Sequence, residues 1–310
     1  MEVRPYEASL AGAWNAFNAG ARNGHLLFDR GFMDYHADRF ADASLMAFED
    51  GRPVALLPAN RGGETVWSHQ GLTFGGLVVD AARASEVGAI LDACAAALAG
   101  QGARTLVYKA LPPIYHRRPA QEDLSWLFRR GARLVRRDLG TAIDLATPGP
   151  VSSRRTRGAR KAAGASVVFG RSDRWGDYWT LLEGVLAARH GAAATHSLAE
   201  IELLAGRFPD AIALHTAERN GEVLAGVVMF LSGPVAHAQY IAAGEEGRAL
   251  GALDGLFLHL IEGERTRRRW FDFGHSTVDQ GRTLNEGLIR QKEEFGGGGV
   301  VHDVYEVDLA

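Results

Sequence analysis

The sequence has little cysteine, no long apolar run and no excess of either charge. Its 310 residues include a single cysteine, Cys94, so an internal disulfide is excluded. The formal net charge of −3 excludes a global field that would attract nucleic acid or an anionic membrane. No apolar run approaches the roughly 20 residues that a membrane-spanning helix needs. The N-terminus also lacks the basic and apolar regions of a secretory signal. These absences predict a cytoplasmic protein without a membrane span.

Several signatures of catalysis are also absent. No G-x-S-x-G elbow is present, which gives a hydrolase triad no support. His190 and His196 have no acid or cysteine at ligand spacing beside them, so we expect no metal site. With 46% hydrophobic residues, the chain can still build substantial cores, and its length favours two domains.

Two segments of the sequence repeat one pattern of elements. In each, an apolar strand, a turn (Asp50-Gly51 or Asn220-Gly221) and a second strand predict a β-hairpin. Gln70 and Gln239 follow at matching places. After them we expect a helix (82–98 or 252–264) and a further strand (105–109 or 270–273). The pattern predicts two copies of one supersecondary unit. The alternative is two unrelated α/β domains.

The segment after residue 147 is the natural boundary between the copies. Pro148-Gly149-Pro150 interrupts regular structure, and Ser153 is expected to cap a basic helix. This predicts domains at 1–150 and 151–310, each an α/β unit with a mixed sheet and an opening helix, at 10–21 and 175–190. The basic helix is either a solvated face or a phosphate-binding rim. The charges concerned are Arg154, Arg155, Arg157, Arg160 and Lys161.

The stretch from Trp270 to Phe295 is the most informative part of the sequence. Trp270–Phe273 reads as a buried strand, the chain breaks at Gly274, and a helix carrying Asn285 and Lys292 follows. Polar groups at the end of a core strand are where α/β proteins build active sites. We therefore expect an enzyme.

A glycine-containing loop follows the strand that begins at Val235. Gly247, Gly251 and Ala252 would let the backbone approach a ligand, and the free N–H groups of the next helix favour phosphate. Arg248 adds a positive charge. The loop is neither a dinucleotide G-x-G-x-x-G nor a P-loop, and a tight strand-to-helix turn is the alternative interpretation. The corresponding place in the first copy has no glycine.

The order of elements resembles the GNAT acyltransferase superfamily. The duplication, with DFG-x-S before a helix ending in K-E-x-F-G, is more specifically similar to the Fem-type branch. That branch includes peptidoglycan-bridge aminoacyltransferases and acyl-CoA-dependent amino-sugar acyltransferases. The helical-hairpin insertion of tRNA-dependent members has no counterpart here, which favours the acyl-CoA type. The resemblance implies two tandem GNAT-like domains, each a mixed, mostly antiparallel sheet flanked by helices, with one acyl-CoA site in the second.

The resemblance also implies a set of residues that bind the cofactor. Arg248 and Gly251 match the pyrophosphate loop, whereas Leu253 stands where Gly or Ala is usual and Ala252 beside it would serve. Asn285 corresponds to the asparagine that contacts pantetheine or anchors the loop. Lys292 stands where the superfamily commonly has a tyrosine acid, and would stabilise a thiolate or pair with Glu294 or Asp272.

Acyl transfer to an amine requires a base, oxyanion donors and a leaving thiolate. The donors would be backbone N–H groups where the fourth and fifth strands separate, at Tyr240, Ile241 and Ala242. Candidate bases are His275, Asp272 and His69. Asp272 would orient His275 or receive the ammonium itself, and His69 would face the same cleft from the other domain. Each histidine could equally be structural.

The acceptor is expected in a cleft between the halves. Candidate contacts are Tyr115, His116, Arg189, His196, Gln239. The resemblance, with these residues, implies an N-acyltransferase that moves an acyl group from acetyl-CoA or a longer acyl-CoA to an amino sugar, in nucleotide-linked form, for a surface glycan. One alternative is aminoacyl transfer from charged tRNA, which would need a broad basic surface from 154–161 and 265–269. The other is a binding protein of the same fold that has lost catalysis.

Overall fold

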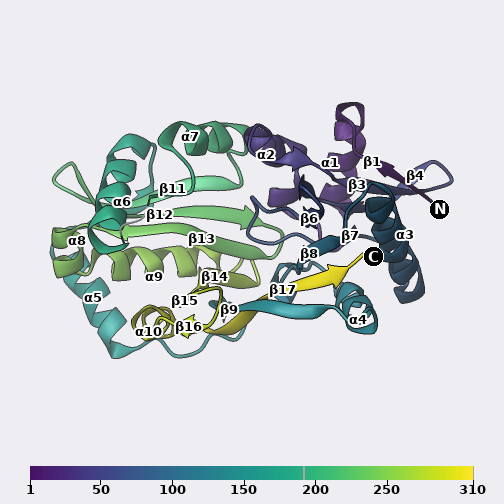
Figure 1. The fold of residues 1–310 in the computed structure, drawn as a ribbon. Helices are drawn as coiled ribbons and strands as arrows, with labels where there is room; N and C mark the ends of the chain where they lie inside the picture. The colour runs from purple at the N-terminus through teal and green to yellow at the C-terminus, as the bar shows by residue number, and fades with distance from the viewer. Residues whose placement is uncertain (191–192, 310) are drawn as a thin grey trace. The chain divides into compact units, whose positions relative to one another are not determined.

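A computed structural model describes residues 1–190 and 193–309, apart from the side chains of residues 189 and 190 (Figure 1). The described chain forms two compact units. Unit 1 contains residues 1–139, 277–283 and 301–310, and unit 2 contains residues 140–276 and 284–300. The strands β9 (Arg133–Asp144) and β17 (Gly298–Asp308) each pass from one unit to the other. The predicted boundary after residue 150 therefore falls inside unit 2.

Unit 1 combines two sheets with helices. Its strands follow the orders β1-β3-β4-β7 and β17-β8-β6-β5-β2. Short 3-10 helices cover Ala8–Leu10, Leu26–Phe28, Asp34–His36 and Pro113–Tyr115. The other elements are β1 (Glu2–Pro5), α1 (Ala11–Gly20), α2 (Arg30–Met33), β2 (Ala41–Asp42), β3 (Leu45–Glu49), β4 (Arg52–Leu57), β5 (Asn60–Gly62), β6 (Thr65–Trp67), β7 (Val78–Val79), α3 (Ala84–Gly100), β8 (Thr105–Lys109) and α4 (Glu122–Arg129).

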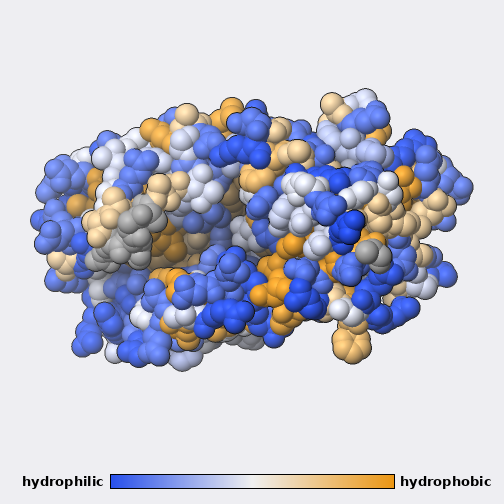
Figure 2. All heavy atoms as spheres, viewed as in Figure 1, coloured by the Kyte–Doolittle hydropathy of each residue, from blue (hydrophilic) through white to orange (hydrophobic). Residues whose placement is uncertain are grey.

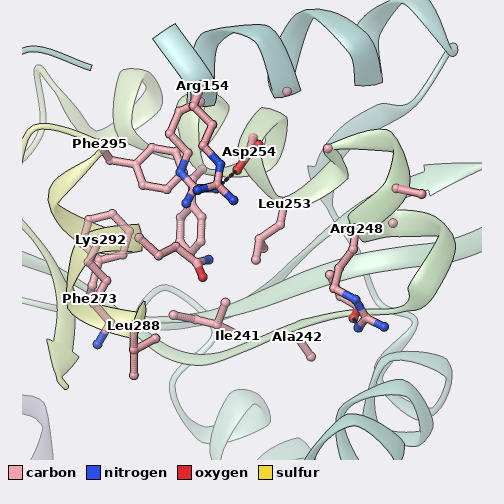
Figure 3. A pocket seen from close by; sticks show the side chains of 18 of the residues that line it. Arg154, Ile241, Ala242, Arg248, Leu253, Asp254, Phe273, Leu288, Lys292 and Phe295 are labelled. Atoms are coloured by element: carbon pink, nitrogen blue, oxygen red, sulfur yellow. Dashed lines mark hydrogen bonds and ion pairs between the residues drawn. The ribbon is translucent and has the colours of Figure 1, made fainter. Parts of the chain in front are cut away.

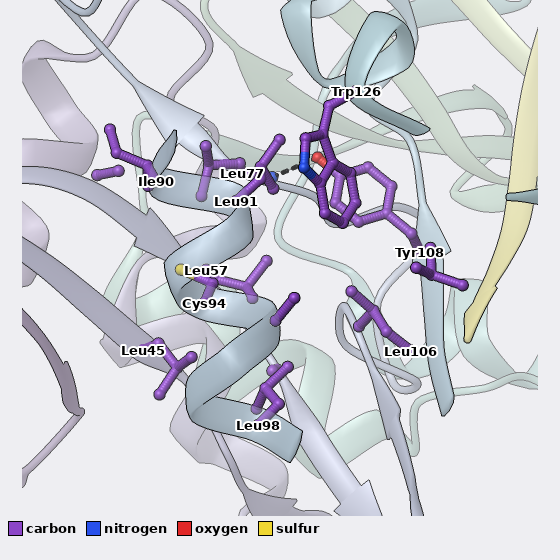
Figure 4. Close-up of a cluster of buried hydrophobic side chains, with 14 of the residues drawn as sticks. Leu45, Leu57, Leu77, Ile90, Leu91, Cys94, Leu98, Leu106, Tyr108 and Trp126 are labelled. Atoms are coloured by element: carbon purple, nitrogen blue, oxygen red, sulfur yellow. Dashed lines mark hydrogen bonds between the residues drawn. The ribbon is translucent and has the colours of Figure 1, made fainter. Parts of the chain in front are cut away.

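The core of unit 1 is built on one apolar face of α3 (Figure 4). Ile90, Cys94 and Leu98 recur at helical spacing and pack onto the strands. Trp126 of α4 closes the core and donates from Nε1 to Asp92 at 2.9 Å. Cys94 is 2% exposed and burial raises the pKa of its thiol to about 12, so it is core filler.

Unit 2 carries one sheet of order β10-β11-β12-β13-β14-β9, in which β13 and β14 are parallel and the other neighbours are antiparallel. Its elements are α5 (Ser153–Gly164), β10 (Val168–Arg171), α6 (Trp175–His190), α7 (Leu198–Arg207), β11 (Ile212–Arg219), β12 (Glu222–Ser232), β13 (Val235–Ala243), α8 (Glu245–Leu250), α9 (Ala252–Glu264), β14 (Trp270–His275) and α10 (Glu286–Glu293). A short hairpin of β15 (Thr277–Val278) and β16 (Thr283–Leu284) follows β14.

The core of unit 2 is rich in phenylalanine. Phe257 of α9 contacts Phe271 and Phe273 of β14, with ring centroids 6.2 and 5.0 Å apart. Phe295, just after α10, lies 5.3 Å from Phe257. The alternation that buries Phe271 and Phe273 also directs Asp272, which lies between them, to the opposite face of β14.

The two predicted hairpins are present. Asp50-Gly51 joins β3 to β4, and Asn220-Gly221 joins β11 to β12, with positive φ at all four residues. Positive φ at both central residues is the type I′ geometry that Asp-Gly and Asn-Gly favour. Each unit also has a parallel pair of strands with a long helix between them in the sequence. These pairs are β6 with β8 and β13 with β14. The predicted mixed, mostly antiparallel α/β architecture is therefore confirmed.

Two local expectations were wrong. Ser152, rather than Ser153, caps α5, because its Oγ accepts from the backbone N–H of Arg155 at 3.3 Å. Gln70 lies in a turn after β6, whereas Gln239 lies in β13, so the two glutamines are not structurally equivalent. In the described part of the chain, every helix is too short or too polar to span a membrane. Figure 2 shows hydrophilic residues over most of the visible face, with hydrophobic residues in small patches.

Candidate functional site

Two neighbouring strands of unit 2 separate to form a fork. β13 and β14 pair in parallel over only three residues, and His237 opposite Asp272 is the last pair. β13 then continues to Ala243, whereas β14 stays paired with β9 on its other side, with a register shift between Asp272 and His275. A register shift in the pairing of β12 with β13 places a bulge at Gln239. Separated strands leave backbone N–H and C=O groups available to a ligand.

A cavity of about 530 Å³ lies at this fork (Figure 3). Ile241 and Ala242 of β13 line one wall, and Phe273 and Phe295 contribute an apolar surface. In Figure 3, Arg248 and Lys292 lie toward opposite ends of the site. Its volume and mixed lining are those of a site for a ligand with an apolar body and charged groups.

The helix α5 adds positive charge to the cavity. Arg154, Gly158 and Lys161 line it, and their spacing of four and three residues puts them on one face of the helix. Arg157 and Arg160 are exposed and do not line the cavity. Of the five basic residues in the predicted phosphate-binding rim, only Arg154, Arg155 and Lys161 therefore line the cavity.

A buried ion pair network holds α5 in place. Arg155 donates from Nη1 to Asp254 Oδ1 at 2.7 Å, and its Nη2 forms an ion pair with Glu294 Oε2 at 2.8 Å. Its guanidinium also lies over the ring of Phe295, 5.3 Å from the centroid. The arginine therefore connects α5, α9 and the end of α10. Because Asp254 and Glu294 neutralise Arg155, the cations left to meet a ligand are those of Arg154, Lys161, Arg248 and Lys292.

The glycines of the α8–α9 turn have a role that the sequence did not reveal. Gly251 has φ +74°, and a Cβ there would lie 2.5 Å from the carbonyl oxygen of Gly158 in α5. A Cβ on Gly247 would collide with the carbonyl oxygen of Leu224. These glycines permit close packing within the protein and also line the cavity, and the approach of a ligand to their backbone stays a prediction. Ala252 is fully buried and does not line the cavity.

Arg248 lies at the cavity and is oriented by the backbone. Its Nη1 donates to the carbonyl oxygen of Ala243 at 2.6 Å, which ties α8 to the end of β13. Gly251 and Leu253 line the same region. The predicted loop of Arg248 and Gly251 is thus next to the cavity.

Lys292 lies at the other side of the cavity, close to the fork. Its Nζ donates to the carbonyl oxygens of Gly274 and His275, at 2.9 and 2.8 Å. Burial lowers the pKa of this lysine to about 8, and the charge of Asp272 opposes that shift. Lys292 pairs with neither Glu294 nor Asp272 directly. It is a buried amine held by two carbonyls on the cavity wall.

Asp272 has a partner that the sequence analysis missed. Its Oδ2 lies 2.7 Å from His237 Nδ1, and its Oδ1 accepts from the backbone N–H of Gly274 at 2.9 Å. His237 Nε2 lies 3.1 Å from Gln239 Oε1. The His275 side chain is exposed at the end of β14, and its orientation by Asp272 stays a prediction. Only the parallel register of β13 and β14, which sequence alone does not determine, brings His237 to Asp272.

The other predicted residues of unit 2 are placed as follows. Tyr240 is buried against Trp179, and its hydroxyl lies 2.6 Å from His196 Nδ1. Burial raises the pKa of Tyr240. Asn285 caps α10 by accepting from the N–H of Leu288 at 3.0 Å, and it does not line the cavity. Arg189 ends α6, and its side chain lies outside the described part of the structure.

The remaining predicted residues belong to unit 1. His69 is buried with φ +84° and stacks on His36, 5.2 Å between centroids. Burial, followed by the charge of His36, lowers the pKa of His69 to about 3. Tyr115 packs against Phe74, and burial lowers the pKa of His116 to about 4. Participation of these residues in one site with those of unit 2 stays a prediction.

The searched part of the chain, residues 1–190 and 193–309, contains no group of three or more His, Cys, Asp or Glu side chains that could hold a metal ion. The donors that line the cavity are mainly arginine and lysine, which suit anionic oxygens rather than a cation. The lining therefore suits an anionic ligand that also has an apolar part.

Comparisons with known proteins agree with this geometry. Residues 152–280 match the family described as "Acetyltransferase (GNAT) domain". This stretch contains β13, α9 and β14, and the expectation of an acyltransferase is confirmed by it. Among curated proteins, none matches the sequence significantly.

Solved structures extend the likeness to nearly the whole chain. FemX superposes with a TM-score of 0.73 at 13% identity, covering 98% of this chain and 97% of the other. The C-terminal domain of a putative lysylphosphatidylglycerol synthetase from Agrobacterium fabrum gives 0.64 at 14% identity, with coverages of 96% and 91%. A tandem GNAT protein from the clavulanic acid pathway gives 0.53 at 14%, with coverages of 100% and 98%. Residues 152–280 therefore match a GNAT acetyltransferase domain, and the chain as a whole has a tandem GNAT-like fold.

Proposed function

We propose that this protein is an N-acyltransferase that moves an acyl group from acyl-CoA to the amine of an amino sugar. The cavity at the fork of β13 and β14 carries this proposal, because it combines cations with an apolar wall. Acyl-CoA has the matching chemistry: phosphates at one end and an apolar arm ending in a thioester at the other. The GNAT match over the same elements supports the assignment.

We assign the phosphates of acyl-CoA to the cationic side of the cavity. Arg248 and Lys161 supply charge there, and the turn before α9 supplies backbone N–H groups. The pantetheine arm would follow β13 at Ile241 and Ala242, whose backbone no longer pairs with β14. The thioester would then reach toward the fork. Asn285 acts in this assignment only by fixing α10.

Lys292 is the proposed cation for the negative charge that develops in the reaction. With a pKa of about 8, it is largely protonated at neutral pH. Two of its three N–H groups are used by carbonyls, which fixes its position in advance. A fixed charge in a dry site stabilises an oxyanion or a leaving thiolate without reorganisation.

The acceptor is proposed as a nucleotide-linked amino sugar for a surface glycan. This part rests on the resemblance of the sequence motifs to the acyl-CoA type of the Fem branch. Aminoacyl transfer from tRNA would need a broad basic surface, and the 265–269 segment does not offer one. Arg265, Arg268 and Arg269 pair there with Glu262, Glu264 and Asp144. We therefore favour a small-molecule acceptor.

Reversing one charge on α5 tests whether acetyl-CoA binds at the side of the helix that lines the cavity. Lys161→Glu should weaken acetyl-CoA binding about 10-fold or more, because it places an anion beside the phosphates. Because Lys161 is exposed, the variant should fold as the wild type does. Isothermal titration calorimetry with acetyl-CoA at 0.15 M salt measures the effect.

Arg160→Glu is the matched control, since it makes the same charge change on the neighbouring residue, which does not line the cavity. At this ionic strength, screening over about 8 Å should leave its affinity within about 2-fold of wild type. Equal losses in both variants would indicate nonspecific attraction and count against the cavity as the binding site. Acetyl-CoA failing to bind the wild type would overturn the proposed function.

The acceptor can be tested separately by thiol release from acetyl-CoA. Nucleotide-linked amino sugars with a free amine should accelerate release, and the N-acetylated product should appear by mass spectrometry. Turnover with an unlinked amine alone, and none with the nucleotide-linked sugars, would contradict the nucleotide-linked acceptor while leaving the acyltransferase intact.

A further inference from the structure

The pair of His237 and Asp272 has the arrangement of a base and its orienting acid. Asp272 is completely buried, and both its oxygens are used, one by His237 and one by the N–H of Gly274. The His237 side chain is 15% exposed. One ring nitrogen is therefore fixed by a buried carboxylate, while the ring keeps access to its surroundings.

The hydrogen bond to Asp272 determines the tautomer of His237. An ionised carboxylate only accepts, so Nδ1 must carry the proton. The neutral ring then has its lone pair on Nε2. Gln239 Oε1 lies 3.1 Å from Nε2, and a rotation of the amide group would present its N–H to this lone pair.

The location of His237 links it to the cavity. It forms the last parallel pair before the fork opens, and its partner Asp272 lies on the face of β14 opposite the cavity-lining Phe273, so the pair adjoins the fork from the other face of the sheet. A Cβ on Gly274 would lie 3.3 Å from His237 Cε1, so the ring packs on that glycine. The carbonyl of the same glycine accepts from Lys292, which lines the cavity. His237 thus lies at the closed end of the fork, where the thioester is expected.

We propose that His237, oriented by Asp272, is the general base that deprotonates the acceptor amine. This inference rests on the proposed acyltransferase function and names a catalytic residue for it. The acceptor N–H group would replace the Gln239 amide at Nε2.

The step is balanced in atoms and charge. His237 Nε2 takes a proton from the ammonium, and the free amine attacks the thioester carbon. A C–N bond forms, the C–S bond breaks, and the thiolate leaves as the second N–H proton is lost to it. The products are amide, free thiol and a proton that His237 returns to solvent. Lys292, whose charge also acts on Asp272, remains protonated throughout.

His237→Asn tests the base without removing its structural bond. An asparagine amide nitrogen can occupy the place of Nδ1 and still donate to Asp272, but it leaves nothing at Nε2. We expect kcat/KM with acetyl-CoA and UDP-glucosamine, which has a free amine, to fall by about 10²–10⁴-fold. Acetyl-CoA affinity should stay within about 2-fold of wild type. Imidazole in the buffer should restore part of the activity of His237→Gly, a result that a purely structural role would not give.

His259→Asn is the matched control, because His259 is an exposed histidine of α9 outside the cavity. It should leave kcat/KM unchanged. Retention of more than a third of the wild-type activity by His237→Asn would overturn the inference while leaving the proposed function intact. Absence of acetyl-CoA binding to the wild type would instead overturn the proposed function.

Nitrogen NMR of the histidines tests the same inference without any acceptor. In the wild type, the neutral ring of His237 should carry its proton on Nδ1, which faces Asp272, and none on Nε2. Asp272→Asn should shift the ring toward the other tautomer. A ring that is still doubly protonated at pH 9, or an Nε2–H tautomer in the wild type, would exclude His237 as the base.

Discussion

Replacing Arg155 with leucine should lower the free energy of unfolding by about 3–5 kcal/mol, because it removes one partner of a buried ion network. The Arg155 side chain is 9% exposed, and it lies between Asp254 and Glu294, themselves 16% and 19% exposed. Leucine would leave Asp254 without this counter-charge and Glu294 with only the exposed Arg154, 3.8 Å away. Urea unfolding followed by circular dichroism measures the loss.

The loss of Arg155 should also affect the cavity. Arg155 connects α5 to α9 and to the end of α10, and the same helix carries Lys161 to the cavity wall. Acetyl-CoA affinity should therefore fall together with stability. Arg154→Leu is the control, because Arg154 is 69% exposed and lies 3.8 Å from Glu294. That change should alter stability by less than about 1 kcal/mol. A loss below 1 kcal/mol in Arg155→Leu would contradict the role of the network.

Acid should destabilise the protein through three histidines that are neutral when folded. Burial lowers the pKa of His69 to about 3 and the pKa values of His116 and His215 to about 4. The unfolded chain, with histidine near 6.5, then binds protons that the folded state does not. The stability that these neutral histidines contribute is fully present above pH 6.5. It is lost as the pH falls toward their pKa values in the folded state.

The expected effect between pH 7 and pH 5 is about 1–2 kcal/mol for each histidine. Asp123 opposes it by about 1 kcal/mol, since burial raises its pKa to about 6 and the folded state then gains a proton over this range. The net loss should be about 2–5 kcal/mol. Urea unfolding at pH 7, 6 and 5 measures it.

His69→Asn removes the contribution of one histidine to this pH dependence. Asparagine tolerates the positive φ of this residue and does not titrate. The variant should lose about 1–2 kcal/mol less than the wild type between pH 7 and pH 5. An unchanged pH dependence would show that His69 is not buried as a neutral ring.

The sequence predicted the parts of the fold that depend on local signals. Asp50-Gly51 and Asn220-Gly221 require positive φ that few residue pairs adopt, and both hairpins are present. The predicted bounds of α6 and α9, 175–190 and 252–264, agree with the structure. Such features need only neighbouring residues.

The parts that could not be predicted depend on contacts between distant segments. His237 becomes the partner of Asp272 only through the register of two parallel strands separated by α8 and α9. Gly251 is required because Gly158, some 90 residues earlier in the chain, crosses it at van der Waals distance. The face of α5 that each basic residue occupies, by contrast, can be predicted from the sequence. Steps of four and three residues from Arg154 place Lys161 on the same face of the helix, whereas Arg157 and Arg160 lie off that face.

The central claim is that acyl-CoA occupies the cavity at the fork of unit 2. Hydrogen–deuterium exchange with and without acetyl-CoA tests it most directly, because it reports on each backbone segment. We predict slower exchange in α5, at residues 241–254, and in α10, with no change in α3 or β8. Binding without protection of these segments, or protection confined to unit 1, would contradict the claim.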